Sequence, residues 1–457
     1  MKLSWKTSLL GGLVAANLLA CGEEQKPTPD DKPAGQRIEV TEKITTDTTW
    51  KAENVYVLKG HVFVESGTLK IEAGTRIEGE GLSSLVVTTG GRIDAVGTQD
   101  KPIVFTSTKA EGTRAPADWG GVVLLGKAPI NVQGGTTLIE GFPATQPGIT
   151  YGGTDEAHDC GKLKYVRIEF AGFKLTANNE LNGLTLGGCG NKTEVDYLQV
   201  HKGADDGVEM FGGTANLKHI VVTQPDDDGL DWDIGYRGKV QFLIVQQNPD
   251  VGNFAFEGDN SPNNPGVATP VSTPEIWNAT LIGSNQEPGK AGKLQGGMHL
   301  KNGTAGTLRN IIVANFTDIA VDIDGTPTVA RLSDTANTLS LQNILYWDNK
   351  NVSDTVPPAP QVVKDASGNV TDPDKTRYDE SALAASGNRA LLNNDPKLTG
   401  ALNLLAPDFK PQAGSPALVS DYAAVPENKG FFDTNARFIG AIGTEDWTKG
   451  WTAFPRD

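Results

Sequence analysis

The chain repeats one short strand motif four times, as NGLTLGG (182–188), DGVEMFGG (206–213), DGLDWDIG (228–235) and NFAFEGD (253–259). Apolar and polar residues alternate within each motif, which is the pattern of a strand with one buried face. When the motifs are aligned, their apolar residues recur at offsets of 24, 22 and 24 residues. They form two columns: Leu184, Val208, Leu230 and Phe254 in the first, and Leu186, Met210, Trp232 and Phe256 in the second.

A second strand repeats in step with the first. The segments YVRIEFAG, YLQVHKG, HIVVTQP and FLIVQQN bring Val166, Leu198, Ile220 and Leu243 into register. A period in the low twenties with two or more strands in each repeat predicts an all-β fold, the right-handed parallel β-helix, in which each coil buries its inward face against its neighbours. Equivalent residues of successive coils are then expected to stack about 4.8 Å apart.

Three later segments carry an asparagine at a common position. WNATLIG, RNIIVAN and QNILYWDN place Asn278, Asn310 and Asn343 at intervals of 32 and 33 residues. This spacing predicts an asparagine ladder at a turn, with side-chain amides hydrogen-bonded from coil to coil. We interpret this ladder as a structural feature.

One β-helix domain is predicted over residues 38–457, because alternating strand patterns broken by Gly or Asn begin at Ile38 and no stretch shows a sustained helical period. Solenoids usually place their binding surfaces on insertions between coils. Loop insertions are predicted at about 108–160, 258–275, 285–297 and 350–380. The aromatic-rich residues from about 421 to 457 are expected to cap the last coil, whose strand edge would otherwise be open.

Residues 1–20 have the features of a bacterial lipoprotein signal peptide. Two lysines precede an uncharged run that is too short to span a bilayer. The run ends in Leu18-Leu19-Ala20-Cys21, which resembles the lipobox of bacterial lipoproteins, so Cys21 is the predicted site of lipidation and the membrane anchor. An ordinary secretory peptide with an incidental cysteine is the alternative.

The residues after Cys21 predict how the β-helix domain is attached to the membrane. Residues 21–37 are charged and Pro-rich and are expected to form a disordered tether. Gly22 follows the lipidated cysteine, where an Asp would indicate retention in the inner membrane, so the outer membrane is favoured. The predicted location is therefore the cell envelope.

Charge and cysteine content limit the partners and the covalent structure. The formal net charge is −16, and removal of residues 1–20, which hold two lysines and no acid, changes it to −18. Nucleic acid is therefore excluded as a partner. With Cys21 lipidated, Cys160 and Cys189 remain, and in an oxidising compartment they predict a disulfide. Two buried thiols are the alternative.

Several motifs also carry a family resemblance. The segments DWGGVVLLGKAPIN, YVRIEFAG, NELNGLTLGG, DDGVEMFGG and GYRGKVQFLIVQQ, with the closing DPKL, AGSPAL and DWTKGWT, resemble a family of largely uncharacterised β-helix surface lipoproteins of Gram-negative bacteria. The resemblance covers most of residues 50–320. It implies a parallel β-helix at the cell surface, and it implies no activity.

The aligned repeat predicts an acidic ladder on one outward face. Strand alternation turns Asp231 outward above Glu209, and turns Asp233 outward one coil from Glu257. Asp206 and Asp228 form a further column at the turn, beside Asp205 and Asp227. Carboxylates stacked this closely repel one another unless a cation or a proton intervenes. The candidate calcium ligands are Asp205, Asp206, Glu209, Asp227, Asp228, Asp231, Asp233 and Glu257.

Three interpretations of this ladder remain open. Bound Ca²⁺, which takes six to eight oxygen ligands, is the favoured one. The second is a polysaccharide lyase or glycoside hydrolase, in which Asp206, Asp228 and Asp231 act as acid and base. The third is a solvated acidic face whose Asp-Gly pairs form turns. Under the second interpretation the substrate-binding candidates are His201, Lys202, Arg237, His299 and Lys301.

The sequence alone therefore favours a non-enzymatic, lipid-anchored envelope protein. Its rigid acidic face is expected to be stiffened by Ca²⁺ and to bind glycans or other envelope components, and the enzyme is the alternative. The five histidines lack metal-ligand spacing, which argues against zinc. No other cofactor is predicted.

Overall fold

The structure is a computed structural model that describes residues 35–176, 179–285, 295–349, 391 and 394–456. The predicted signal peptide, the lipidation site Cys21 and nearly all of the predicted tether lie outside the described residues, as do the predicted loop at 350–380 and most of the one at 285–297. No helix in the described ranges is long and apolar enough to cross a membrane.

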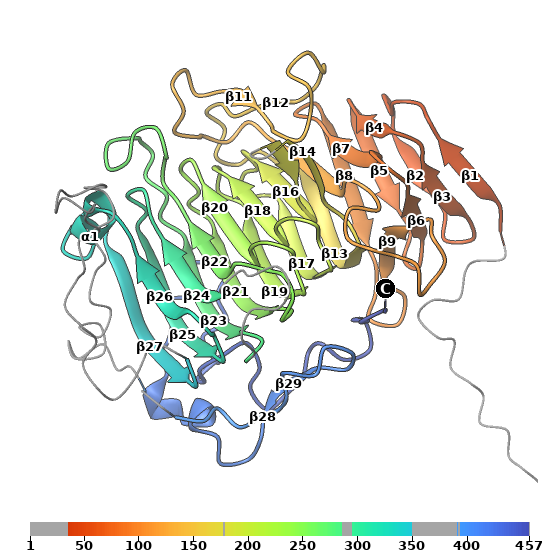
Figure 1. The fold of residues 1–457 in the computed structure, drawn as a ribbon. Helices are drawn as coiled ribbons and strands as arrows, with labels where there is room; N and C mark the ends of the chain where they lie inside the picture. Colours follow the sequence, from red (N-terminus) through yellow and green to blue (C-terminus); the bar gives the residue numbers. More distant parts are fainter. Residues whose placement is uncertain (1–34, 177–178, 286–294, 350–390, 392–393, 457) are drawn as a thin grey trace, which may run out of the picture. The chain divides into compact units, whose positions relative to one another are not determined.

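Two long parallel sheets run the length of the described body (Figure 1). The longer sheet contains β1 (Arg37–Val40), β2 (Thr48–Trp50), β3 (Val55–Leu58), β5 (Gly67–Ile71), β6 (Arg76–Gly79), β8 (Gly91–Val96), β9 (Ile103–Ser107), β13 (Gly161–Glu169), β17 (Glu194–His201), β19 (Asn216–Thr223), β21 (Lys239–Gln246), β23 (Glu275–Ile282), β25 (Gly306–Ala314) and β27 (Leu339–Trp347). The shorter sheet contains β4 (His61–Val64), β7 (Ser84–Val87), β10 (Val122–Leu125), β16 (Leu184–Gly187), β18 (Val208–Phe211), β20 (Leu230–Asp233), β22 (Phe254–Gly258), β24 (Gly296–Leu300) and β26 (Ile319–Ile323).

Smaller elements lie outside these sheets. They are the antiparallel pairs β11 (Thr137–Leu138) with β12 (Thr150–Tyr151), β14 (Phe173–Thr176) with β15 (Asn179–Leu181) and β28 (Leu398–Gly400) with β29 (Asp408–Pro411), the short helix α1 (Thr326–Arg331), and the 3₁₀ turns Pro416–Leu418 and Ser420–Tyr422. The chain passes from one long sheet to the other and back in every coil, so the fold is the predicted right-handed parallel β-helix.

The strand register confirms most of the predicted columns. Val166, Leu198, Ile220 and Leu243 are neighbours on successive strands of the longer sheet. In the shorter sheet, Val208 pairs with Leu184 on one side and Leu230 on the other. These inward side chains are completely or almost completely buried and form one continuous apolar core. Burial of this kind contributes roughly 25 cal/mol for each Å² of apolar surface.

The register prediction is wrong at the last repeat. Leu230 pairs with Phe256 and Trp232 with Gly258, so the step between these coils is two residues longer than the motif alignment gave. A shift of two residues keeps the same side chains pointing inward, because the strand period is two. Alternation alone therefore could not detect it. Gly258 is required here, since a Cβ at this position would lie 2.2 Å from the Trp232 ring.

Each long strand from β13 to β27 bends at one non-glycine residue with left-handed φ. These residues are Tyr165, Tyr197, His219, Phe242, Asn278, Asn310 and Asn343. Asn tolerates this conformation better than most residues. The predicted asparagines therefore stand in one column at a turn, but the proposed ladder of bonds between them is wrong. Asn278 donates its amide to Phe438 O, Asn310 to Ala424 O and Asn343 to Tyr422 O. One amide bond does join neighbouring coils, since Asn278 Oδ1 accepts from Gln241 of β21.

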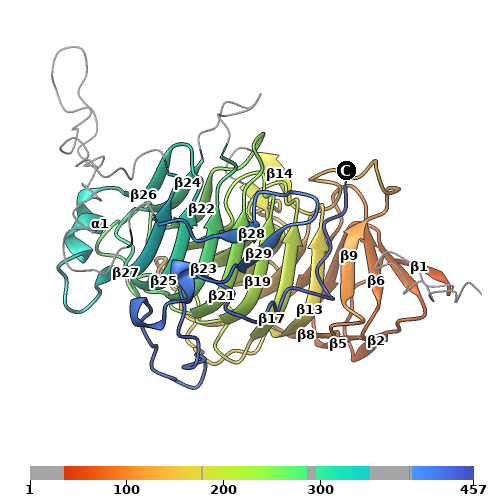
Figure 2. The same cartoon turned by 90° about the horizontal axis from the view of Figure 1, so that it is seen from below.

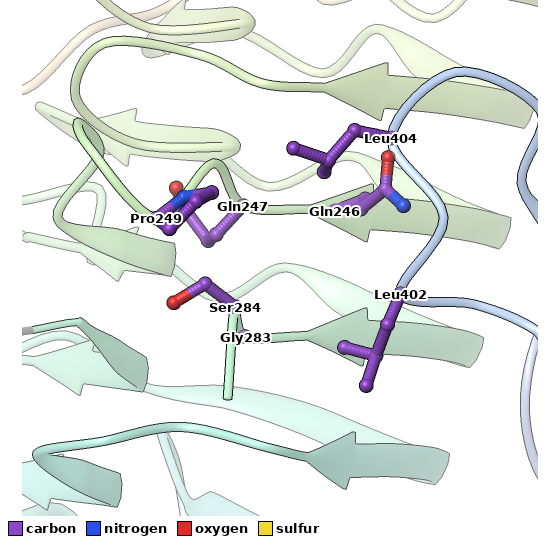
Figure 3. A pocket seen from close by; sticks show the side chains of 7 residues that line it. All are labelled: Gln246, Gln247, Pro249, Gly283, Ser284, Leu402 and Leu404. Carbon is purple, nitrogen blue, oxygen red and sulfur yellow. The ribbon is translucent and has the colours of Figure 1, made fainter. Parts of the chain in front are cut away.

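Residues 394–456, which we call the C-terminal strap, run back along the outside of the longer sheet (Figure 2). The strap bonds to Asn343 in β27, and its last residues bond to Gln199 in β17 through Ala453, so it passes several coils. Figure 3 shows Leu402 and Leu404 of the strap beside Gln246, around a cavity of about 30 Å³ that is large enough only for water.

The prediction that residues 421–457 cap the last coil is therefore wrong for the described part of this segment. The strap covers a second apolar cluster, formed by outward side chains such as Ile244 and Ile312 and by Phe409, Ile439 and Trp451 of the strap itself. Aromatic residues near the C-terminus bury the outward face of the longer sheet. Sequence alone cannot distinguish this role from covering the open edge of the last coil.

The predicted disulfide is confirmed between Cys160 and Cys189. Cys160 precedes β13 and Cys189 follows β16, and both side chains are buried. The bond closes a segment in which the two cysteines are 29 residues apart. It therefore joins the residue before β13 to the residues that follow β16 in the same coil.

The asparagine contacts make the strap testable. Asn310 donates to Ala424 O and accepts from Ala424 N, at 2.8 Å in each case. Asn310→Ala removes both bonds and leaves backbone groups without partners, so we expect the free energy of unfolding to fall by about 1–3 kcal/mol. Denaturant titration measures it. Asn191→Ala, at an exposed position, is the matched control and should change the free energy of unfolding little. Equal stability of the two variants would contradict the contact between Asn310 and the strap.

Candidate functional site

Acidic side chains gather on the outward side of the shorter sheet. Glu209 in β18, Asp231 in β20 and Glu257 in β22 are direct neighbours on successive strands, and His299 in β24 follows Glu257. The predicted stacking of Asp231 on Glu209 is confirmed. The predicted position of Asp233 beside Glu257 is wrong, because the shift described above brings Asp231 there instead.

A second acidic column lies at the turn before these strands. Asp206 Oδ1 accepts a hydrogen bond of 2.9 Å from the backbone N–H of Asp228, and Asp228 Oδ1 accepts one of 2.5 Å from Phe254 N. Each carboxylate therefore fixes the turn of the next coil, as expected for Asp in a turn. One oxygen of each is used in this way, which leaves the other for a further partner.

The two columns converge on two overlapping groups of acids. Asp206, Glu209 and Asp231 have carboxylate oxygens within 4.8 Å of one another, and so do Asp228, Asp231 and Glu257. Asp231 belongs to both groups. Its Oδ1 is buried and has no hydrogen-bond partner among the described residues. A buried carboxylate oxygen of this kind requires a proton or a cation.

Three of the acids are covered rather than presented to solvent. Asp206, Glu209 and Asp228 are only 7%, 7% and 5% exposed. The excursion at 126–156 packs over the outward face of the shorter sheet, where its Ile139 and Tyr151 join an apolar cluster with Phe211. The interpretation as a solvated acidic face is therefore wrong for these acids.

Three of the eight predicted calcium ligands do not belong to the two groups. Asp205 forms an ion pair of 2.7 Å with Lys174 of β14, and Asp227 lies 4.0 Å from the same ammonium. Asp233 accepts a hydrogen bond from the backbone N–H of Ile234. The other five, Asp206, Glu209, Asp228, Asp231 and Glu257, form the site that we call the acidic cluster.

Two of the predicted substrate-binding residues belong beside this cluster. His299 Nδ1 lies 3.2 Å from Glu257 Oε2, and Lys301 pairs with the other oxygen of the same carboxylate. Burial works against ionisation of Glu257, but the hydrogen bonds and charges of His299 and Lys301 lower its pKa to about 2. Burial opposes the charge of His299 as well, yet Asp324 and Glu257 raise its pKa to about 9.

The other substrate-binding candidates have different surroundings. His201 is completely buried under the strap, with Nδ1 2.7 Å from Thr223 Oγ1 and Nε2 3.1 Å from Pro455 O, so its assignment to a substrate site is wrong. Arg237 pairs with Glu156 of the excursion at 3.1 Å. Lys202 lies at the left-handed turn that follows β17. The structure does not gather the five candidates into one subsite.

Burial and mutual repulsion dominate the electrostatics of the acids. The pKa values of Asp206, Glu209 and Asp231 are raised well above normal, first by burial and then by neighbouring carboxylates. The same causes raise the pKa of Asp228 and Asp233. Protons or a divalent cation are therefore needed to hold these groups together.

Sequence reasoning missed three side chains of this region. Asn182 donates its amide to Glu209 Oε2 and accepts from Asp206 N, and it occupies the same repeat position as Asp206 and Asp228, so alignment of the motifs could have found it. Glu140 comes from the excursion, and burial followed by repulsion from Glu180 raises its pKa to about 7. Asp259 follows β22; burial raises its pKa to about 6. Glu140 lies outside the repeat, so no periodic signal marks it. Asp259 ends the fourth motif, and the error of two residues in the alignment hid its equivalence to Asp233.

The family comparison agrees with the fold. Residues 42–391 match the model of the pectate-lyase-like β-helix domain. The chain belongs to this family. No curated protein and no solved structure gives a significant match. Membership in the pectate-lyase-like family therefore establishes the architecture, and the chemistry has to be argued from the acidic cluster.

The raised pKa values predict how stability depends on pH when no divalent cation is present. A carboxyl group whose pKa is higher in the folded state takes up a proton on folding, so it stabilises the protein as the pH falls. Glu140 and Asp259, at about 7 and about 6, set the window. We expect the melting temperature in chelator to rise as the pH is lowered from about 7.5 to about 5.5.

The ion pairs of Glu257 do not oppose this trend inside the window. The stabilising contribution of His299 is lost only as the pH rises toward about 9, and that of Glu257 only as the pH falls below its unfolded value toward about 2. Asp231→Asn should reduce the slope, whereas Asp250→Asn, at an exposed position, should not. A melting temperature that falls steadily from pH 7.5 to 5.5 would contradict the electrostatic account.

Proposed function

We propose that this chain is a lipid-anchored, non-enzymatic β-helix protein of the bacterial cell envelope, in which Ca²⁺ bound by the acidic cluster stiffens a scaffold that binds glycans or other envelope components. The observation that carries the proposal is the meeting of five acids from neighbouring coils in two groups that share Asp231. Ca²⁺ prefers carboxylate and carbonyl oxygens in flexible geometry, which this donor set offers.

The position of the cluster suggests what the cation does. Asp206 and Glu209 belong to one coil, Asp228 and Asp231 to the next, and Glu257 to a third. A cation bound here links adjacent coils and offsets the repulsion between them. We infer that the anchor is the lipid on Cys21 and that the outer membrane is the location, on the sequence evidence above.

The alternative is a polysaccharide lyase or glycoside hydrolase that uses Asp206, Asp228 and Asp231. Membership in the pectate-lyase-like family favours it. Two observations weigh against it. Asp206 and Asp228 are covered, and both accept bonds from the backbone of the next coil, as structural residues do. An acid that protonates a glycosidic oxygen has to reach the polymer.

Melting with and without calcium tests the proposal. A ligand that binds the folded state alone stabilises it by mass action, by about 2.7 kcal/mol at a hundredfold excess over Kd. We expect the wild type to melt higher in Ca²⁺ than in chelator. Asp231→Asn should lose this gain yet equal or exceed the wild type in chelator, because it removes a repelled carboxylate.

The control is Asp250→Asn, an exposed acid outside the cluster, which should keep the full calcium response. An unchanged melting temperature of the wild type in saturating Ca²⁺ would refute the metal site. Release of reducing ends from a polysaccharide, lost in Asp231→Asn, would establish the enzyme instead.

A further inference from the structure

A polar cavity lies on the longer sheet, whereas the acidic cluster lies on the shorter one. The cavity has a volume of about 560 Å³, within the range of small-ligand sites, and lies between the outward face of β17, β19 and β21 and residues 429–431 of the strap. Four lysines line it: Lys192, Lys218, Lys239 and Lys429. Such a concentration of cations is unexpected in a chain with a formal net charge of −16.

The acids of the cavity are already neutralised from outside it. Glu194 pairs with Lys162 at 3.0 Å. Asp196 pairs with Lys164 at 3.1 Å and lies 2.8 Å from His219 Nδ1. Neither Lys162 nor Lys164 lines the cavity. The negative charges of the cavity wall are therefore balanced by lysines other than the four that line it.

The lining lysines differ in how they are engaged. Lys429 pairs with Glu275 at 2.8 Å. Lys192 and Lys239 have no ion-pair partner within the described ranges, and Lys218 donates to Phe431 O at 3.1 Å. Within the described ranges these three ammonium groups therefore form no ion pair with a carboxylate.

Lys218 is held in place by its surroundings. Its ammonium lies 5.6 Å from the centre of the Phe242 ring and 5.5 Å from that of Phe431, which is cation–π distance. Burial lowers its pKa, although Asp433 and Asp196 act in the opposite direction. A cation that is partly desolvated and positioned in this way gains from an anion in the cavity.

The remaining lining fits a hydroxylated ligand. Asn191 and Asn216 supply side-chain amides, and the ring of Phe431 supplies an apolar surface. Lysine ammonium groups bind phosphate as point charges, and a phosphomonoester carries about two negative charges at neutral pH. Three lysines without an ion-pair partner match such a group better than they match a single carboxylate.

We propose that this cavity binds a phosphorylated sugar, with Lys192, Lys218 and Lys239 around the phosphate and Phe431 and the amides against the sugar. This proposal deepens the binding part of the proposed function and rests on it. The cavity lies on a different sheet from the acidic cluster, so a failure of this site and a failure of the calcium site are seen in different experiments.

Calorimetric titration of the full chain tests the site. The probes are a phosphorylated hexose, the same hexose without phosphate, the corresponding uronic acid and inorganic phosphate. We expect the phosphorylated hexose to bind most tightly, and Lys192→Gln and Lys239→Gln each to weaken it about tenfold, as for loss of one charged hydrogen bond. Lys70→Gln, at an exposed position on β5, is the matched control.

Each other outcome decides against the proposal. Equal affinity for inorganic phosphate would mean an anion site that does not recognise a sugar, and equal affinity for the uronic acid would refute the choice of phosphate. Binding that Lys192→Gln and Lys239→Gln leave unchanged would place the ligand elsewhere. Both lysines act from the surface of the wall, so the variants are expected to melt like the wild type, and melting curves verify this.

Discussion

The structure depends on the vertical stacking of equivalent residues in successive coils. Parallel pairing places Val208 beside Leu184 and Leu230 and repeats this arrangement along the whole body. On the inward side the result is a continuous apolar core, which no single coil could form. On the outward side the same register places acid beside acid, because charged residues recur at equivalent positions of the repeat just as apolar residues do. The acidic cluster is therefore a consequence of the fold, and the protein has to neutralise it.

The inward columns were predictable because they depend only on period and alternation. The acid pair Glu209 and Asp231 followed from the same alignment, and so did the disulfide from the count of cysteines. The position of Glu257 did not, since the two additional residues before β22 leave the inward and outward pattern unchanged. Motif similarity favoured the wrong alignment, and only the packing of Gly258 against Trp232 selects the right one.

Burial of the outward face was not predictable from the repeat. The excursion at 126–156 and the strap both fold back over the coils, and they carry no periodic signal. Both segments change the surroundings of residues on the coils. The excursion covers the acids with Tyr151 and Glu140. The strap buries His201 under Pro455 and forms the lysine-lined cavity with Phe431. Strand alternation indicates which side chains leave the core, but it cannot show what covers them.

The central claim is that stacked acids of neighbouring coils share a divalent cation. The most direct test is a crystal structure of the protein soaked with a lanthanide ion, which replaces Ca²⁺ and scatters X-rays anomalously. The account predicts an anomalous peak within coordination distance of Asp231 and of at least two of Asp206, Glu209, Asp228 and Glu257. Its contradiction would be an ordered crystal in which these carboxylates show no peak while ions bind elsewhere on the surface.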